Sequence, residues 1–172
     1  MIIKIIGCIV IMLCSVKIGF DEAGKFRTRI NEIREIQTAF AALKGEIGFR
    51  RAPIAEALAN AGIMLKTSVA KLFLTAKDEL KSDNITAAEA WERSFEKTKE
   101  QLCLTAEELY IVSSFGKLLG VSDTSGQLEN IELATARLEL CEKQAIEDER
   151  RRGRLYRSLG VIGGIVLAVI FI

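Results

Sequence analysis

The residue types that most often carry catalysis are scarce in this chain of 172 residues. Histidine is absent, which removes the commonest general base, the usual zinc ligand and the usual partner of a serine or cysteine nucleophile. The cysteines show no C-x-x-C or paired metal-ligand spacing; they are Cys8, Cys14, Cys103 and Cys141. The sequence also has no glycine-rich phosphate-binding loop. We therefore predict that the protein is not an enzyme and has no catalytic residues, no metal site and no cofactor.

The charged residues favour neither an acid/base site nor nucleic-acid binding. Glu147-Asp148-Glu149 is the densest acidic run, but adjacent positions of a helix point in different directions. A solvated charged face is therefore the favoured interpretation of this run. Lys and Arg number 24 against 23 Asp and Glu, a net charge of +1, so no overall basic field attracts DNA or RNA.

Five arginines precede the last fifteen residues, which are uncharged: Arg150, Arg151, Arg152, Arg154 and Arg157. Residues 155–172 would form a helix of roughly 27 Å, close to the roughly 30 Å hydrocarbon layer of a bilayer. We predict a transmembrane helix there. Because short flanks rich in Lys and Arg stay on the cytoplasmic side, the body of the protein should be cytoplasmic. The arginines suit this topological role and also binding to anionic lipid.

Residues 1–20 are almost wholly apolar and predict a second transmembrane segment. More Lys and Arg follow this segment than precede it, which again places the middle of the chain in the cytoplasm. A cleaved signal peptide is the alternative, although no Ala-x-Ala-like cleavage site follows. The predicted domains are an N-terminal span at 1–20, a cytoplasmic helical bundle at 21–154 and a C-terminal span at 155–172.

The middle of the chain has apolar residues at helical spacing throughout and no alternating strand pattern. The spacing predicts helices at about 21–48, 53–62 and 65–80, two more after residues 86 and 105, and a long one from 123 or 124 to the arginines. The helix after residue 86 should carry Trp91, Phe95 and Leu102. Short turns join them. We therefore predict an all-α fold, an antiparallel bundle of about six helices flanked by N- and C-terminal transmembrane helices.

Three local signals fix predicted helix ends. Thr86 with Glu89, and Thr105 with Glu108, match the capping box, in which two side chains satisfy the free N–H groups at a helix start reciprocally. Gly120 is suited to a left-handed helix stop. A short turn at residues 121–123 should therefore connect the last two helices of the bundle.

That turn lies inside the most specific pattern of the chain, residues 115–131, which contains Leu119-Gly120, Ser122-Asp123, Gly126-Gln127 and Asn130-Ile131. The pattern resembles the stage III sporulation protein AB family of endospore-forming bacteria. The resemblance extends to the apolar start, the helical middle, the basic run and the segment Gly160-Val161-Ile162-Gly163-Gly164.

The resemblance implies a component of the membrane complex that links mother cell and forespore, located in the mother-cell membrane around the forespore. It also implies a cytoplasmic domain similar to those of the type II secretion platform protein F. The implied partners are the sporulation AA ATPase and other proteins of the channel complex, and a homo-oligomer is compatible with this picture. The expected function is thus a non-enzymatic scaffold that docks the ATPase to the membrane. The alternative is a small membrane-bound regulator or sensor whose bundle binds a ligand or protein, which a deep pocket with convergent polar groups would favour.

Two sets of residues are candidates for contacts. The turn residues either dock a partner or only close a tight helix hairpin; they are Gly120, Ser122, Asp123, Gly126 and Gln127. Gly160 and Gly164 form a G-x-x-x-G pattern that permits close packing of a second span, either the first span of the same chain or one of a neighbouring copy.

Overall fold

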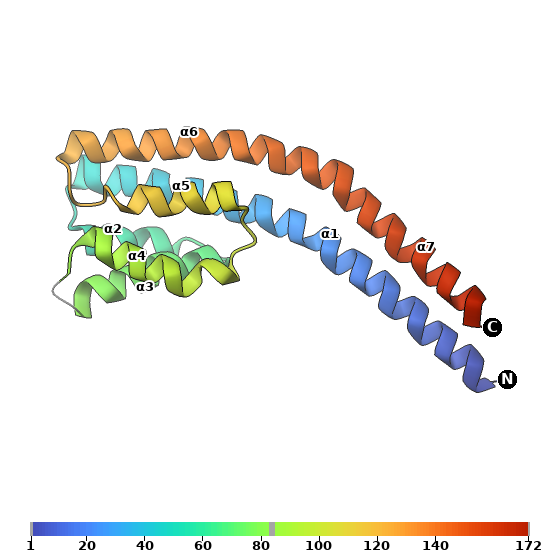
Figure 1. The fold of residues 1–172 in the computed structure, drawn as a ribbon. Coiled ribbons are helices and arrows are strands. Elements are labelled where there is room, and N and C mark those ends of the chain that lie inside the picture. Colours follow the sequence, from blue (N-terminus) through green and yellow to red (C-terminus); the bar gives the residue numbers. More distant parts are fainter. Residues whose placement is uncertain (1, 83–84, 172) are drawn as a thin grey trace. The chain divides into compact units, whose positions relative to one another are not determined.

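The computed structural model describes residues 2–82 and 85–171, with side chains described for residues 7, 9–81 and 85–166. Within the described residues the fold is all helical (Figure 1), as predicted. The α-helices are α1 (Ile2–Gly45), α2 (Ile54–Ile63), α3 (Ser68–Ser82), α4 (Ala87–Thr98), α5 (Ala106–Gly116), α6 (Thr124–Asp148) and α7 (Arg154–Phe171). Two π-helical turns, η1 (Glu46–Arg50) and η3 (Glu149–Gly153), and one 3-10 turn, η2 (Lys99–Gln101), complete the set.

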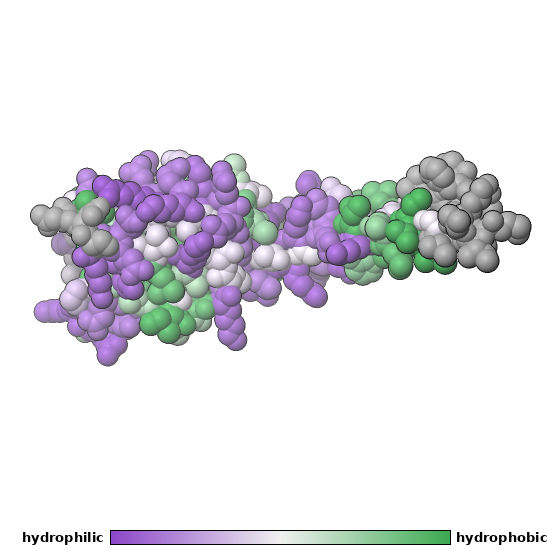
Figure 2. Space-filling view, turned by 90° about the horizontal axis from the view of Figure 1, so that it is seen from below, coloured by the Kyte–Doolittle hydropathy of each residue, from purple (hydrophilic) through white to green (hydrophobic). Residues whose placement is uncertain are grey.

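The chain divides into two compact units. Unit 1 comprises the described parts of residues 1–28 and 144–172, and unit 2 comprises those of residues 29–143. Unit 2 is built from parts of α1 and α6 together with α2, α3, α4 and α5. On the face that Figure 2 shows, hydrophilic residues cover most of unit 2.

Four aromatic rings form the centre of unit 2. Phe40 of α1 lies 4.3 Å from Phe115 of α5 between ring centroids, and Trp91 of α4 lies 5.1 Å from Phe73 of α3. The Trp91 indole Nε1 donates to the backbone oxygen of Val112 at 3.0 Å, which satisfies the polar atom that this large side chain carries into the core. The rings thereby join four helices into one hydrophobic core.

The apolar faces predicted for the two long helices are buried in unit 2, which confirms their helical periodicity. On α1 the fully buried side chains are Ile33, Ile36, Phe40 and Leu43. On α6 the buried side chains are Ile131, Ala134, Leu138 and Cys141. Beside them, α2 packs on α3 and α3 packs on α4.

Some predicted helix ends differ from the observed ones. Leu102 was expected within the fourth bundle helix, but α4 ends at Thr98 and continues only as the 3-10 turn η2. The Thr98 hydroxyl donates to the backbone oxygen of Ser94 at 2.8 Å, and such back-bonding commonly accompanies a change of helical geometry. Leu102 therefore lies in the following loop, where its side chain is still buried. No break separates α6, η3 and α7, as the pattern predicted.

Unit 1 pairs the start of α1 with α7, which Figure 1 shows side by side. Gly19 and Gly160 meet at their backbones: a Cβ added to Gly160 would lie 3.0 Å from Gly19 Cα and 3.0 Å from Ser15 O. A Cβ added to Gly164 would lie 3.3 Å from Met12 O. Small residues thus allow the two helices to approach closely.

The predicted transmembrane segments, residues 1–20 and 155–172, fall in α1 and α7. The side chains of residues 1–6, 8 and 167–172 lie outside the described part of the chain. Among the residues that were described, none of the helices combines the length and the apolar character needed to cross a membrane.

Candidate functional site

The turn between α5 and α6 has the left-handed glycine that the sequence predicts. Gly120 has φ +76°, a conformation that costs other residues free energy because of their Cβ. A Cβ at this position would also lie 3.0 Å from Ile54 Cδ1 and 3.2 Å from Ala87 Cβ. Gly120 therefore both reverses the chain and lets the turn pack against α2 and the start of α4.

Asp123 caps the start of α6, and Gly126 lies in its first turn. The Asp123 carboxylate accepts a hydrogen bond from the Gly126 N–H at 2.9 Å, the bond by which a helix N-cap satisfies a free backbone donor. A Cβ on Gly126 would come within 2.9 Å of Ser122 Cβ. Ser122, Asp123 and Gly126 therefore form one compact cap.

Gln127 and Asn130 connect α6 to the backbone that precedes it. Gln127 Nε2 donates to the Ser122 carbonyl at 3.1 Å, and Asn130 Nδ2 donates to the Phe115 carbonyl at 3.0 Å. The Phe115 carbonyl also accepts from the Leu118 N–H at 3.3 Å, so these side-chain bonds reinforce the end of α5 and the turn. Asp123, Gln127 and Asn130 thus stabilise the turn itself. Contacts with a partner protein are therefore better sought among the exposed side chains beside them.

Three large apolar side chains are exposed at this end of unit 2: Phe49 is 90%, Val121 69% and Leu118 49% exposed. Phe49 lies in η1. Its neighbour Gly48 lies close to α6, as a Cβ added to Gly48 would be 3.3 Å from Leu128 Cδ2. Val121 directly precedes the start of α6. We call this set the end surface, defined as Phe49, Arg51, Lys117, Leu118, Val121 and Asp123, all of which are exposed.

The end surface is continuous with a groove between α5 and α6. This groove has a volume of about 150 Å³ and shares Leu118 with the end surface. Its other lining residues include Leu133, which is 54% exposed, and Arg137. Large apolar side chains flanked by basic ones are typical of protein contact surfaces.

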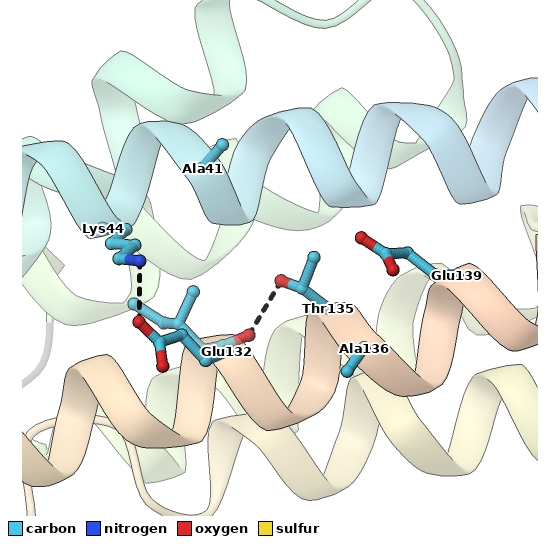
Figure 3. A pocket seen from close by; sticks show the side chains of 7 residues that line it. Ala41, Lys44, Glu132, Thr135, Ala136 and Glu139 are labelled. Carbon is cyan, nitrogen blue, oxygen red and sulfur yellow. Dashed lines mark hydrogen bonds and ion pairs between the residues drawn. The ribbon is translucent and has the colours of Figure 1, made fainter.

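A second groove, between α1 and α6, has a volume of about 340 Å³ (Figure 3). Its rim carries the ion pair between Lys44 Nζ and Glu132 Oε1 at 2.7 Å, and Ala41 and Ala136 also line it. The Glu139 carboxylate lies apart from this pair along the groove (Figure 3). This arrangement lacks the convergent polar groups that would favour a ligand-binding sensor. Among the described residues no group of three or more His, Cys, Asp or Glu side chains is placed to hold a metal ion.

Unit 2 contains a buried charged cluster that the sequence pattern did not predict. The Glu108 side chain is fully buried, and Arg29 of α1 donates to both of its oxygens at 2.6–3.1 Å. Glu108 Oε2 also accepts from the Thr105 N–H at 2.7 Å, as the predicted capping box requires. The capping pattern was thus the only sequence signal for a carboxylate that also holds a distant helix.

Glu32 lies one turn after Arg29 and is buried as well. Its carboxylate accepts from the Cys103 N–H at 2.6 Å, which ties α1 to the loop before α5. Burial, with smaller contributions from the nearby charges of Glu35 and Glu108, raises the pKa of Glu32 to about 7. A carboxyl of this kind changes charge near neutral pH.

The basic run of unit 1 is exposed and partly ion-paired. Arg150, Arg151 and Arg152 lie in η3, and Arg154 and Arg157 lie in α7. Arg157 Nη2 donates to Glu149 Oε1 at 3.0 Å, and Arg152 Nε lies 3.4 Å from Asp148 Oδ1. The acidic run at 147–149 thus supplies partners for the arginines, which agrees with the interpretation as a solvated charged face.

Comparison with known proteins agrees with the resemblance noted in the motif. A family model described as stage III sporulation protein AB matches residues 4–172. The stage III sporulation protein AB of Bacillus subtilis (strain 168) is 29% identical over 168 residues, which are 98% of this chain and 98% of that protein. A solved structure of stage III sporulation protein AB matches with a TM-score of 0.68 and 30% identity, covering 72% of this chain and 98% of the solved chain. Since the family model matches nearly all of its residues, the chain belongs to the stage III sporulation protein AB family.

Proposed function

We propose that this chain is a non-enzymatic membrane scaffold of the sporulation channel complex, which docks an AA-type secretion ATPase through its helical bundle. Membership of the stage III sporulation protein AB family supports the role in sporulation. The exposed apolar pair Phe49 and Val121, on the end surface, is the observation that carries the docking step. Burial of exposed apolar side chains of this kind contributes favourably to the free energy of binding.

The proposal places the bundle on the cytoplasmic side of the membrane, held by residues 1–20 and 155–172. The arginines at 150–157 support this orientation, because Lys and Arg flanks remain on the cytoplasmic side. Cys103 is suited to test the topology, since it is exposed, whereas Cys141 is buried. With the other cysteines replaced by serine, Cys103 in intact protoplasts should resist a membrane-impermeant maleimide and react after permeabilisation. Labelling without permeabilisation would refute the orientation.

Docking is best tested on side chains that do not build the turn. Asp123 and Gln127 hydrogen-bond within the turn, so their replacement would alter its shape as well as its surface. Phe49→Asp and Val121→Asp change side chains that are mostly exposed and should leave the fold intact. Leu140→Asp is the matched control, because Leu140 is 61% exposed on α6 but lies outside the end surface.

The experiment is co-purification of the ATPase with the full chain from membranes of sporulating cells, followed by an affinity measurement with the purified proteins. Each end-surface variant should weaken binding at least about tenfold, as expected for loss of an apolar anchor. The Leu140 control should bind normally. Unchanged binding of both Phe49→Asp and Val121→Asp would remove the end surface as the docking site.

A further inference from the structure

Two hollows on the surface of unit 1 meet at the same pair of side chains, Phe20 of α1 and Arg157 of α7. The first, of about 220 Å³, is lined by Phe20, Ala23, Gly24, Arg27 and Arg157. The second, of about 350 Å³, is lined by Phe20, Arg157, Ser158, Val161 and Ile162. Because they share Phe20 and Arg157, the two hollows are adjacent, and we call them together the hairpin groove.

The two ends of the hairpin groove differ in chemistry. Arg27 lines the first hollow, Arg157 lies where the two hollows meet, and none of the lining residues is acidic. The other end is apolar and exposed: Phe20 is 54%, Val161 38% and Ile162 57% exposed. Arg27 lies seven residues after Phe20, about 10 Å along a helix. The groove thus changes from apolar to cationic over roughly the depth of a lipid headgroup region.

The cationic end has room for a ligand. A Cβ added to Gly24 would meet nothing within 4 Å, in contrast to Gly19, whose Cβ would lie 2.8 Å from Gly160 Cα. The groove is therefore open at Gly24, while the helices are in contact one turn away. Arg157 gives one N–H to Glu149 at 3.0 Å, and a guanidinium carries five such donors. Arg27 is exposed and has no ion pair within the described part of the chain.

We propose that the hairpin groove binds one anionic phospholipid, with its phosphate at Arg27 and Arg157 and an acyl chain along Phe20, Val161 and Ile162. Charge complementarity selects the anionic headgroup, and the apolar end covers the chain that a free phosphate lacks. This inference rests on the membrane location in the proposed function. It adds a defined lipid site to the general attraction between an arginine run and an anionic membrane.

The test measures lipid binding to the full chain in detergent micelles by native mass spectrometry, with phosphatidylglycerol and phosphatidylcholine added separately. Wild type should retain phosphatidylglycerol in preference to phosphatidylcholine. Arg27→Gln should weaken phosphatidylglycerol binding about fivefold, and the Arg27→Gln/Arg157→Gln double variant roughly twentyfold, as expected for basic residues at an anionic headgroup. Arg151→Gln/Arg154→Gln is the matched control, since it removes the same charge outside the groove, and it should bind like wild type.

Three results would overturn the site: equal retention of both lipids, equal loss in the groove variant and the control, or competition by glycerol 3-phosphate as strong as that by the intact lipid. The last result would indicate a phosphate site without recognition of the acyl chain. Circular dichroism of each variant checks that its helical content is retained. If wild type selects phosphatidylglycerol but does not fractionate with membranes in cells, the membrane scaffold fails and the lipid site stands. If the wild-type chain fractionates with membranes but does not select phosphatidylglycerol, the lipid site is refuted and the membrane scaffold is not.

Discussion

Arg29 of α1 donates to both carboxylate oxygens of Glu108 of α5, at 2.6–3.1 Å, although the Glu108 side chain is fully buried. The two residues are 79 positions apart in the chain. A bidentate arginine–carboxylate pair fixes both distance and direction, and this one joins the longest helix of the chain to the helix that leads into the motif turn. The position of that turn within unit 2 therefore depends partly on a charged contact in the core.

Removal of the Glu108 charge should destabilise the bundle strongly. Glu108→Gln keeps the shape of the side chain but deprives the largely buried Arg29 guanidinium of its carboxylate, which typically costs about 3–5 kcal/mol. Urea unfolding of the full chain in detergent, followed by Trp91 fluorescence, would measure this. Glu132→Gln is the control, because the Lys44–Glu132 pair is exposed and should contribute less than about 1 kcal/mol. Equal effects of the two substitutions would contradict a structural role of the buried pair.

Glu32 should make stability depend on pH near neutrality. Burial raises the pKa of Glu32 from its ordinary value of 4.5 to about 7, so between these values the folded chain binds a proton that the unfolded chain has lost. The contribution of Glu32 to the free energy of unfolding is therefore complete below pH 4.5 and falls as the pH rises through about 7. Over this range the loss should reach roughly 3 kcal/mol at most.

Glu32→Gln tests this dependence, because its amide oxygen can still accept from the Cys103 N–H while it cannot ionise. Its stability relative to wild type should increase as the pH is raised from 4.5 to 8. Thermal unfolding at several pH values would measure the difference, with Glu132→Gln as a variant that should parallel wild type. A constant difference between Glu32→Gln and wild type across the range would show that Glu32 does not titrate there.

Gly120→Ala should destabilise the turn, whereas Gly45→Ala should not. Gly120 has φ +76°, and a Cβ there would lie 3.0 Å from Ile54 Cδ1 and 3.2 Å from Ala87 Cβ, while a Cβ on Gly45 would meet nothing within 4 Å. A left-handed alanine costs roughly 1–2 kcal/mol, and the close contacts add to this cost. Alanine at Gly45, in a helix, should be neutral or stabilising by up to about 1 kcal/mol. Unfolding curves of the two variants measure their stability. If both variants were destabilised, or if neither were, the different roles given to Gly120 and Gly45 would be wrong.

Gly160→Leu should separate the paired helices of unit 1, and Gly163→Leu should do so less. A Cβ on Gly160 meets the backbone of Gly19 and Ser15 at 3.0 Å, while a Cβ on Gly163 meets only Ser15 Oγ at 3.5 Å. A cysteine pair at positions 12 and 164, with native cysteines replaced, should form a disulfide in membranes of otherwise wild-type protein. The cross-linking yield should fall several-fold with Gly160→Leu and remain higher with Gly163→Leu. The same yield in both backgrounds would argue against close backbone contact at Gly160.

The existence of the helices, the buried faces of α1 and α6, the Thr86 cap and the left-handed conformation of Gly120 could be predicted from sequence, because each depends on residues within a few positions of one another. The predicted helix stop at Gly120 was wrong, because α5 ends at Gly116. The helix ends near Leu102 and Gly116 could not be predicted in this way. At Gly116 the Trp91 ring occupies the place that a Cβ would need, and this contact is between two helices, α4 and α5, so it depends on how they pack.

The sequence by itself determined the helical class, the family and the position of the motif turn, since periodicity, caps and motif spacing are local properties of the chain. Only the tertiary structure showed that Asp123 and Gln127 build the turn, that Phe49 and Val121 remain exposed beside it, and that Arg29 and Glu108 form a buried pair. Pairing, burial and open grooves depend on which distant segments meet. That is decided by the packing of the whole core, which no local pattern records.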